Sequence, residues 1–252
     1  MSLTVMITGA GSGFGKDASL ALAARGHRVI ATTETDEQAD LLRAEAPQLT
    51  VERVDITTDD VNKASTWDID VLINNAGAGQ TGPMADVPLD RVRRLFEVNV
   101  FGTLAVTQRV LRGMVAKGSG RVMIVSSIAG VVAGQTIGPY AMTKHALEAM
   151  GKAMRAELAP QGIDVTMLNP GPYQTGFNDR MAGTMWEWFG ADALNAPSAP
   201  LFKSIGEMVL GAQLDPSEVT QKMVELTEAE TTTFNNFVPP DISPQLASLL
   251  ER

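Results

Sequence analysis

The sequence predicts an α/β protein built on a doubly wound parallel sheet, and three observations lead to that prediction. Short, unbroken apolar runs alternate with helical patterns along the chain, as expected for parallel strands covered on both faces. A glycine-rich turn follows the first run, at the sheet edge where such folds bind ligands. No linker or repeat divides the 252 residues. We therefore expect a single domain over residues 1–252.

The elements are expected in the following order. The predicted strands are residues 5–7, 29–31, 51–54, 71–73, 122–125 and 165–168, with a further one near 234–238. The predicted helices are residues 15–24, 37–46, a short one near 60, a pair within 89–116, 140–158 and one near 217–226. The Pro- and Met-rich stretch 171–216 is predicted to be irregular, and we interpret it as a lid inserted into the domain.

Composition excludes several classes of protein. The chain has no Cys, which excludes disulfides, iron–sulfur ligation and thiolate zinc sites. With only His27 and His145, a histidine-based metal site is not expected. Acidic residues outnumber basic ones 29 to 20, which argues against nucleic acid and anionic membranes as partners. The chain shows no secretory signal and no apolar run of ~18 residues, so we expect a cytoplasmic protein without metal.

The glycine-rich turn Thr8-Gly9-Ala10-Gly11-Ser12-Gly13-Phe14-Gly15 stands between the first strand and the first helix. Glycines allow backbone N–H groups to approach a pyrophosphate, to which the helix N-terminus adds a favourable dipole. Gly15 lets the helix lie close to the sheet. The alternative is a plain tight turn, and the TGxxxGxG spacing differs from the GxGxxG dinucleotide pattern.

Tyr140 and Lys144 stand four residues apart at the start of a predicted helix and therefore share one face. Ser127 lies 13 residues before Tyr140, just past a strand. A phenol with a pKa of ~10 is a poor base near neutral pH. An ammonium ~4 Å away stabilises the phenolate by about 4 kcal/mol, which would bring the pKa near 7. The alternatives are a Tyr–Lys pair on a solvated helix and a serine that only caps a strand.

Together these residues resemble the short-chain dehydrogenase/reductase family, and the resemblance covers Leu3 to about Thr175. The family's motifs occur in order along the chain. The nucleotide motif is Thr8–Gly15, the NNAG motif is Asn74–Gly77 and the family's asparagine is Asn99. The catalytic set is Ser127, Tyr140 and Lys144, and the segment that binds the carboxamide is Pro170–Thr175. This resemblance implies a Rossmann fold and hydride transfer to or from a nicotinamide cofactor.

The resemblance also implies a role for each catalytic residue. Ser127 would hydrogen-bond the substrate oxygen, and Tyr140 would exchange its proton with that oxygen. Lys144 would lower the pKa of Tyr140 and bind the ribose hydroxyls, while Asn99 would hold a water that links Lys144 to solvent.

By the same resemblance, the cofactor would be bound by residues from several segments. Asp55 would accept from the adenine amino group, although a turn-forming Asp is the alternative. Tyr173 replaces the small residue common in the family, so its ring could project into the pocket. The predicted cofactor-binding residues are Gly9, Ser12, Gly13, Phe14, Gly15, Glu34, Asp55, Ile56, Asn75, Ala76, Gly77, Tyr140, Lys144, Pro170, Gly171, Tyr173 and Thr175.

The end of the second predicted strand bears on the choice between NAD and NADP. Glu34 lies 19 residues past Gly15, close to the ~20 expected for the acid that binds the ribose 2′-hydroxyl. In the family register the usual Asp falls at Thr33, and Glu34 takes a position where NADP enzymes often carry Arg. A carboxylate opposes a 2′-phosphate, so we expect NAD, with NADP as the alternative and a solvated loop glutamate as the bland interpretation.

The lid indicates the substrate. It is rich in Met and aromatic residues and has no basic cluster that could clamp an acid or phosphate. We expect a hydrophobic secondary alcohol or ketone. Two alternatives are an NADP-dependent carbonyl reductase and a non-catalytic regulator that senses dinucleotides. The predicted pocket residues are Ser127, Gln135, Tyr140, Met181, Met185 and Trp186.

The second long helical pattern predicts self-association. Small residues recur along 140–158 and permit close helix packing, although alanine also serves helix propensity. Because the family pairs this helix and the one over 102–116 across a two-fold axis, we expect a homodimer or homotetramer. The family's VDGG-type ending, which helps to close tetramers, is replaced here by Phe237-Val238-Pro239-Pro240.

Overall fold

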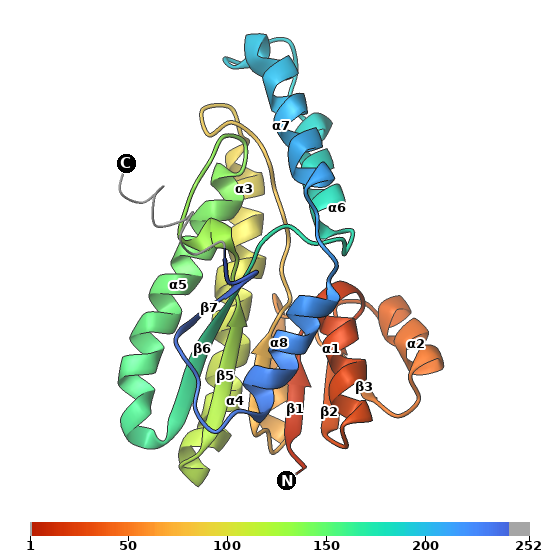
Figure 1. Ribbon diagram of the computed structural model, residues 1–252, viewed down its shortest axis with the longest axis vertical. Helices are drawn as coiled ribbons and strands as arrows, with labels where there is room; N and C mark the ends of the chain where they lie inside the picture. Colours follow the sequence, from red (N-terminus) through yellow and green to blue (C-terminus); the bar gives the residue numbers. More distant parts are fainter. Residues whose placement is uncertain (1, 242–252) are drawn as a thin grey trace.

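The structure of the chain is a computed structural model that describes residues 2–241. A seven-stranded parallel sheet runs through its centre in the order β3-β2-β1-β4-β5-β6-β7 (Figure 1). The strand order reverses at β1, so the doubly wound parallel fold predicted from the sequence is confirmed. The strands are β1 (Thr4–Ile7), β2 (Arg28–Thr33), β3 (Thr50–Arg53), β4 (Val71–Asn74), β5 (Gly120–Val125), β6 (Ile163–Pro170) and β7 (Asn235–Val238).

The unbroken apolar strands divide their side chains between two cores. In β1, Val5 and Ile7 face the core formed with α1 (Gly13–Ala24) and α8 (Ser217–Glu228). Met6 faces the core formed with α4 (Thr103–Lys117) and α5 (Gly138–Leu158). In β5, Met123 joins the first core and Ile124 the second. Both faces are covered, which is why these strands read as continuous apolar runs rather than alternating ones.

Capping residues mark the ends of several helices. The Thr35 side chain accepts from the N–H of Gln38 at the start of α2, and α4 ends at Gly118 with a left-handed φ of 66°. The pattern over 89–116 is two helices, as predicted, joined by a π-helical turn. The helices of the body are α1 (Gly13–Ala24), α2 (Asp36–Glu45), α3 (Leu89–Phe96), α4 (Thr103–Lys117), α5 (Gly138–Leu158) and α8 (Ser217–Glu228).

The stretch 171–216 is largely helical, so the prediction of an irregular segment is wrong. It contains α6 (Phe177–Gly183) and α7 (Ala199–Gly211), which project beyond the end of the body (Figure 1). Pro197 and Pro200 stand in the first turns of a short 3₁₀ helix and of α7, where a missing N–H costs nothing. At its base, Tyr173 and Leu214 form a parallel bridge. We call residues 174–213 the lid.

The remaining boundaries differ by a few residues from the predictions. The segment near residue 60 is a 3₁₀ helix, Asp59–Thr66, whose first turn is capped by Thr58. Residue 1 and the tail 242–252 of the expected domain lie outside the described residues. Within residues 2–241, no helix combines the length and apolarity that crossing a membrane requires.

An ion cluster joins the start of β2 to the end of α8. Arg25 donates from Nε and Nη2 to the two carboxylate oxygens of Glu228, each at 2.6 Å. His27 Nε2 lies 3.0 Å from Oε1 of the same carboxylate. The His27 side chain is only 5% exposed and Nδ1 accepts the N–H of Leu3, so it is not a solvated loop residue. Hydrogen bonds from Arg25 and His27 lower the pKa of Glu228 from 4.5 to about 2.

We expect Glu228→Gln to lower the melting temperature at pH 7 by ~2–4 °C, the shift that about 1 kcal/mol produces in a chain of this size. Because the folded-state pKa is depressed, this stabilisation is complete above pH 4.5 and is lost as the pH falls toward 2. Melting curves of both proteins from pH 2 to pH 7 test it, with exposed Glu225→Gln on the same helix as the control. A difference that persists unchanged at pH 2 would contradict the assignment.

Candidate active site

The glycine-rich turn after β1 is held in place by the loop after β4. The Thr8 hydroxyl accepts the N–H groups of Asn75 and Ala76, both at 3.0 Å. In return, the Asn75 amide donates to the carbonyls of Thr8 and Gly9 at 3.0 and 3.1 Å. A Cβ on Gly15 would lie 2.4 Å from that amide, so only glycine allows this packing. Asn75 and Ala76 therefore hold the turn in shape, and the cofactor contacts expected of Asn75, Ala76 and Gly77 stay a prediction.

The N-terminus of α1 fits the phosphate role predicted for it. Ser12 precedes the helix in extended conformation, and its side chain makes no capping hydrogen bond. Gly13 has a φ of +54° and faces the Thr175 side chain, 3.1 Å from where its Cβ would be. Backbone N–H groups at a helix N-terminus suit a pyrophosphate. The first and last cofactor motifs therefore meet at this turn.

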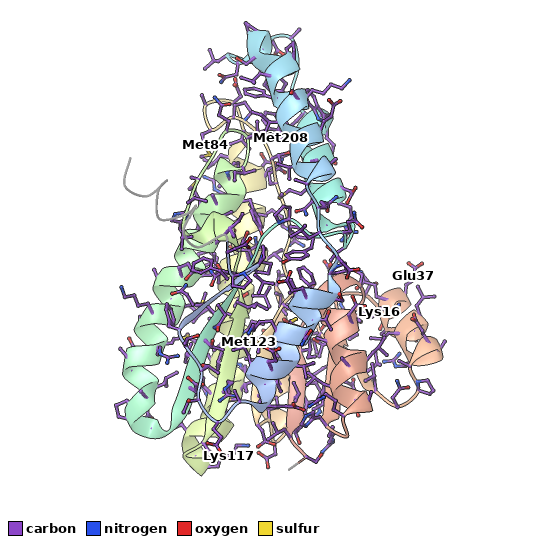
Figure 2. All side chains as sticks on the ribbon, in the orientation of Figure 1. Lys16, Glu37, Met84, Lys117, Met123 and Met208 are labelled. Atoms are coloured by element: carbon purple, nitrogen blue, oxygen red, sulfur yellow. The ribbon has the colours of Figure 1, made fainter. Side chains whose placement is uncertain are left out.

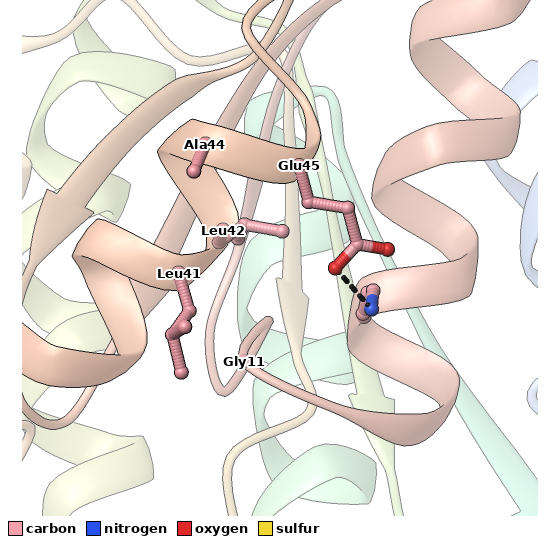
Figure 3. A pocket seen from close by; sticks show the side chains of 6 residues that line it. Gly11, Leu41, Leu42, Ala44 and Glu45 are labelled. Atoms are coloured by element: carbon pink, nitrogen blue, oxygen red, sulfur yellow. Dashed lines mark hydrogen bonds and ion pairs between the residues drawn. The ribbon is translucent and has the colours of Figure 1, made fainter.

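A pocket of about 470 Å³ lies on the α2 side of the same turn (Figure 3). It is lined by Gly11 of the turn, Lys16 of α1 and side chains of α2. Lys16 donates to Glu45 at 2.6 Å across it, so the lysine nearest to the turn is already paired with a carboxylate.

Glu34 and Asp55, the carboxylates predicted to bind adenosine, follow the ends of β2 and β3. Glu34 follows β2 and is exposed, and its N–H donates to the Gln38 side chain at 3.1 Å. Asp55 accepts from the N–H and the hydroxyl of Thr57 at 2.9 and 2.8 Å. Burial alone would raise the pKa of Asp55, but these hydrogen bonds lower it overall. Ile56 is buried in the core against Gly102.

The helix α5 carries Tyr140 and Lys144 on a buried face. Tyr140 is 8% exposed and Lys144 is 5% exposed, so the alternative of a solvated Tyr–Lys pair is excluded. The Lys144 ammonium donates to the Val125 carbonyl at 2.8 Å and lies 5.5 Å from the centroid of the Tyr140 ring. The end of β5 thus fixes the lysine beneath the phenol.

Ser127 and Asn99 complete the predicted catalytic set. The Ser127 hydroxyl accepts the N–H of Ala129 at 3.1 Å and donates to the Pro170 carbonyl at 3.4 Å. Asn99 lies in the π-helical turn Glu97–Gly102. Its side chain accepts the Ala78 N–H at 2.7 Å and donates to Thr143 of α5 at 3.0 Å. Asn99 therefore fastens the loop after β4 to α5, and its water-holding role stays a prediction.

The electrostatics differ from the expectation of a phenol near neutral pH. Burial raises the pKa of the Tyr140 phenol above its usual value, and Ser127 only partly opposes this shift. Burial also lowers the pKa of Lys144 to about 8, against the charge of Glu148. The prediction was wrong on this point because it included the field of the ammonium and left out the burial of both groups.

Comparison with known proteins agrees with this geometry. The family model described as short chain dehydrogenase matches residues 3–185. The chain belongs to the short-chain dehydrogenase family.

Relatives of this short-chain dehydrogenase include proteins with and without an assigned substrate. The uncharacterized oxidoreductase YusZ of Bacillus subtilis is 38% identical over 182 residues, which are 68% of this chain and 65% of YusZ. The NADPH-dependent 3-dehydrocapnine reductase of Ornithobacterium rhinotracheale is 35% identical over 184 residues, 68% of this chain and 65% of that protein. The matched segment thus spans slightly less than two thirds of either relative. A short-chain dehydrogenase structure from Streptomyces avermitilis has a TM-score of 0.84 at 28% identity, covering 99% of this chain and 92% of that one.

The lid of this short-chain dehydrogenase covers Tyr140. Met181 is buried in one cluster with Tyr140 and Ala141, and the Phe177 ring lies 5.8 Å from the Tyr140 ring. A Cβ on Gly79 would lie 2.6 Å from Met181, so the loop after β4 needs glycine beneath the lid. Phe177 belongs to the aromatic-rich lid but is not among the residues predicted to line the pocket, because its place in the first turn of α6 depends on a helix that the sequence did not indicate.

Other predicted pocket residues lie apart from this cluster. Met185 is buried within the lid, 2% exposed, rather than beside Tyr140. Trp186 is 46% exposed and packs edge-on against Phe189. Gln135 is exposed in the loop before α5. Of the lid residues predicted to line the pocket, only Met181 is therefore placed against the tyrosine.

Tyr173 departs from the expectation that its ring projects into the pocket. It is 1% exposed, packs edge-on against Phe14 at 5.8 Å and donates to Glu218 of α8 at 3.0 Å. Pro170 ends β6, and the Gly171 N–H donates to the Val238 carbonyl at 2.8 Å. The ring thus anchors the base of the lid to α1 and α8.

Proposed function

We propose that this protein is an oxidoreductase that transfers a hydride between a nicotinamide cofactor, NAD in preference to NADP, and a hydrophobic secondary alcohol or ketone. The observation that supports it most is the buried face of α5, which presents Tyr140 above Lys144 beside Ser127. The apolar contacts of Tyr140 with Phe177 and Met181 favour a substrate without charge. We propose that it acts in the cytoplasm.

The protein's own residues divide the work of the proposed reaction. The bound nicotinamide supplies the hydride acceptor or donor. Tyr140 gives a proton to the substrate oxygen in reduction and takes it back in oxidation. Ser127 hydrogen-bonds that oxygen, and the ammonium of Lys144 stabilises the phenolate that remains. The lid side chains Phe177 and Met181 exclude water from the phenol.

A substrate panel tests the proposal. Purified protein is mixed with aliphatic, alicyclic and aryl secondary alcohols and with the matching ketones, each with NAD(H) and with NADP(H). Turnover is followed by nicotinamide absorbance at 340 nm. Binding of cofactor without turnover on any member would instead support the dinucleotide-sensing regulator. A sugar or a carboxylate as the best substrate would contradict the apolar pocket.

The cofactor preference rests on Glu34. Within residues 2–241 its carboxylate has no ion-pair partner, and it stands exposed at the end of β2. A carboxylate ~5 Å from a 2′-phosphate opposes NADP by roughly 1–3 kcal/mol per unit charge. The second candidate, an NADP-dependent carbonyl reductase, is favoured by the relative from Ornithobacterium rhinotracheale, which is an NADPH-dependent reductase.

We expect the protein to use NAD at least about fivefold more efficiently than NADP, and Glu34→Arg to move the ratio of kcat/KM toward NADP by tenfold or more. Replacing a carboxylate with a guanidinium turns repulsion of the phosphate into attraction. Glu37→Arg, the same charge change at an exposed position of α2, is the control and should leave the ratio within a few fold. Preference for NADP in the parent protein would reduce Glu34 to a surface charge.

We also propose a homodimer or homotetramer that pairs α4 and α5 with their counterparts in a second copy. Large apolar side chains are exposed on these helices and on the π-helical turn that precedes α4: Phe101 of the turn at 53%, Met142 of α5 at 43% and Val115 of α4 at 40%. Light scattering at micromolar concentration measures the mass directly, and the mass of one chain would refute the pairing.

A further inference from the structure

The face of α5 that carries Tyr140 and Lys144 continues to a carboxylate. Glu148 lies four residues past Lys144, and residues so spaced have Cβ atoms about 5–6 Å apart. Glu148 is half-buried and packs against the turn that follows Ser127. A Cβ added to Gly130 in that turn would lie 3.0 Å from the carboxylate.

Two amides from the end of the sheet fix this carboxylate. Asn169 of β6 donates to Glu148 Oε1 at 2.6 Å, and Asn235 of β7 donates to Oε2 at 3.0 Å. Asn169 is fully buried, and its amide also lies 3.4 Å from the Ser127 carbonyl, to which it donates. Since both partners of Glu148 are neutral, they orient the carboxylate without cancelling its charge.

The other charged side chains around α5 are either held in ion pairs or exposed to solvent. On β6, Asp164 is paired with Arg121 and Arg155. The 3₁₀ turn after Ser127 and the strand β7 contribute no charged side chain. The remaining charged residues on α3, the π-helical turn and α5 itself are Asp90, Arg91 (paired with Glu187), Arg93, Arg94, Glu97, His145, Lys152, Arg155 and Glu157. Burial lowers the pKa of Lys144, and the charge of Glu148 is what opposes it.

We propose that Glu148 is a positioning residue of the catalytic site, whose carboxylate keeps the Lys144 ammonium charged beneath Tyr140 and, through Asn169, holds the turn that carries Ser127. Its catalytic consequence rests on the proposed oxidoreductase function. Its effect on Lys144 can be measured without turnover.

The test compares Glu148→Gln with the parent protein and with Glu157→Gln, the same change at an exposed site on α5. Protein labelled with ¹³C at the lysine ε-carbon is titrated by NMR, and the Lys144 signal is assigned by its absence in Lys144→Met. We expect the Lys144 midpoint to fall by about one pH unit in Glu148→Gln, a tenfold change in its proton affinity, and to stay unchanged in Glu157→Gln. The alkaline limb of kcat/KM should move by the same amount.

A second pair of variants, with shorter side chains at position 148, repeats the test so that its result does not depend on a single substitution. Glu148→Asp keeps the charge and Glu148→Asn removes it, so only the second should lower the midpoint. A Lys144 midpoint within 0.3 unit (roughly twofold) of the parent in every neutral variant would overturn the proposal. If the parent shows no turnover on any substrate, the proposed function fails, while the NMR titration still decides whether Glu148 controls Lys144.

Discussion

Tyr140→Phe is expected to lower kcat by about 10²–10⁴-fold, the usual contribution of a positioned general acid–base. The phenyl ring keeps its contacts with Phe177 and Met181, so the lid should close as before. Only the exchangeable proton is removed. Cofactor affinity should therefore stay within a few fold of the parent value, which fluorescence titration with NADH measures alongside steady-state rates.

The chain offers a matched control because it contains only two tyrosines. Tyr173→Phe removes a hydroxyl that donates to Glu218 at the base of the lid, away from Lys144. We expect this variant to lose some thermal stability and to retain most of its activity. Comparable activity in Tyr140→Phe and the parent would remove Tyr140 from the mechanism.

Lys144→Met is expected to reduce kcat/KM by 10²-fold or more and also to weaken cofactor binding. The thioether fills similar space but supplies no charge to Tyr140 and no donor to the Val125 carbonyl. In the parent protein, activity should decline as the pH rises through about 8, where Lys144 loses its proton. That limb should be missing from the variant's pH profile.

The control for this substitution is Lys152→Met, an exposed lysine two turns further along α5. It removes the same charge from the same helix without touching the buried face. An alkaline limb that survives in Lys144→Met would assign the titration to another group, and full activity would show that the ammonium is dispensable.

The strands of the sheet and the shared helix face of Tyr140 and Lys144 were predictable because each depends on a short-range pattern. Apolar runs such as 71–73 fit only strands covered on both faces, and the spacing of Tyr140 and Lys144 fixes a shared helix face. The lid was not predictable in the same way. Its prolines resemble helix breakers until their places in first turns are known, as with Pro200 in α7.

The burial of individual side chains could not be predicted from the sequence. The spacing of Tyr140 and Lys144 suggested a strong lowering of the phenol pKa, but both side chains lie out of water and burial acts against their charged forms. The burial of the Tyr173 ring was likewise not predictable. Tyr173 follows the end of β6, and its ring packs in the core formed with α1 and α8. The place of Glu148 was not predictable because its two amide partners come from strands far along the chain.

The bridge between Tyr173 and Leu214 brings the two ends of the lid side by side. The N–H of Gln174 donates to the Leu214 carbonyl at 2.9 Å, and the N–H of Leu214 donates to the Pro172 carbonyl at 3.0 Å. Met208 lies out on the projecting part, whereas Met123 lies within the sheet (Figure 2). A segment whose ends are already joined can be exchanged for one of another length, because each doubling of a loop's length adds only about 0.6 kcal/mol to the entropy cost of closing it. Substrate range could therefore change by replacement of residues 174–213 while the sheet, the turn after β1 and the catalytic helix stay as they are.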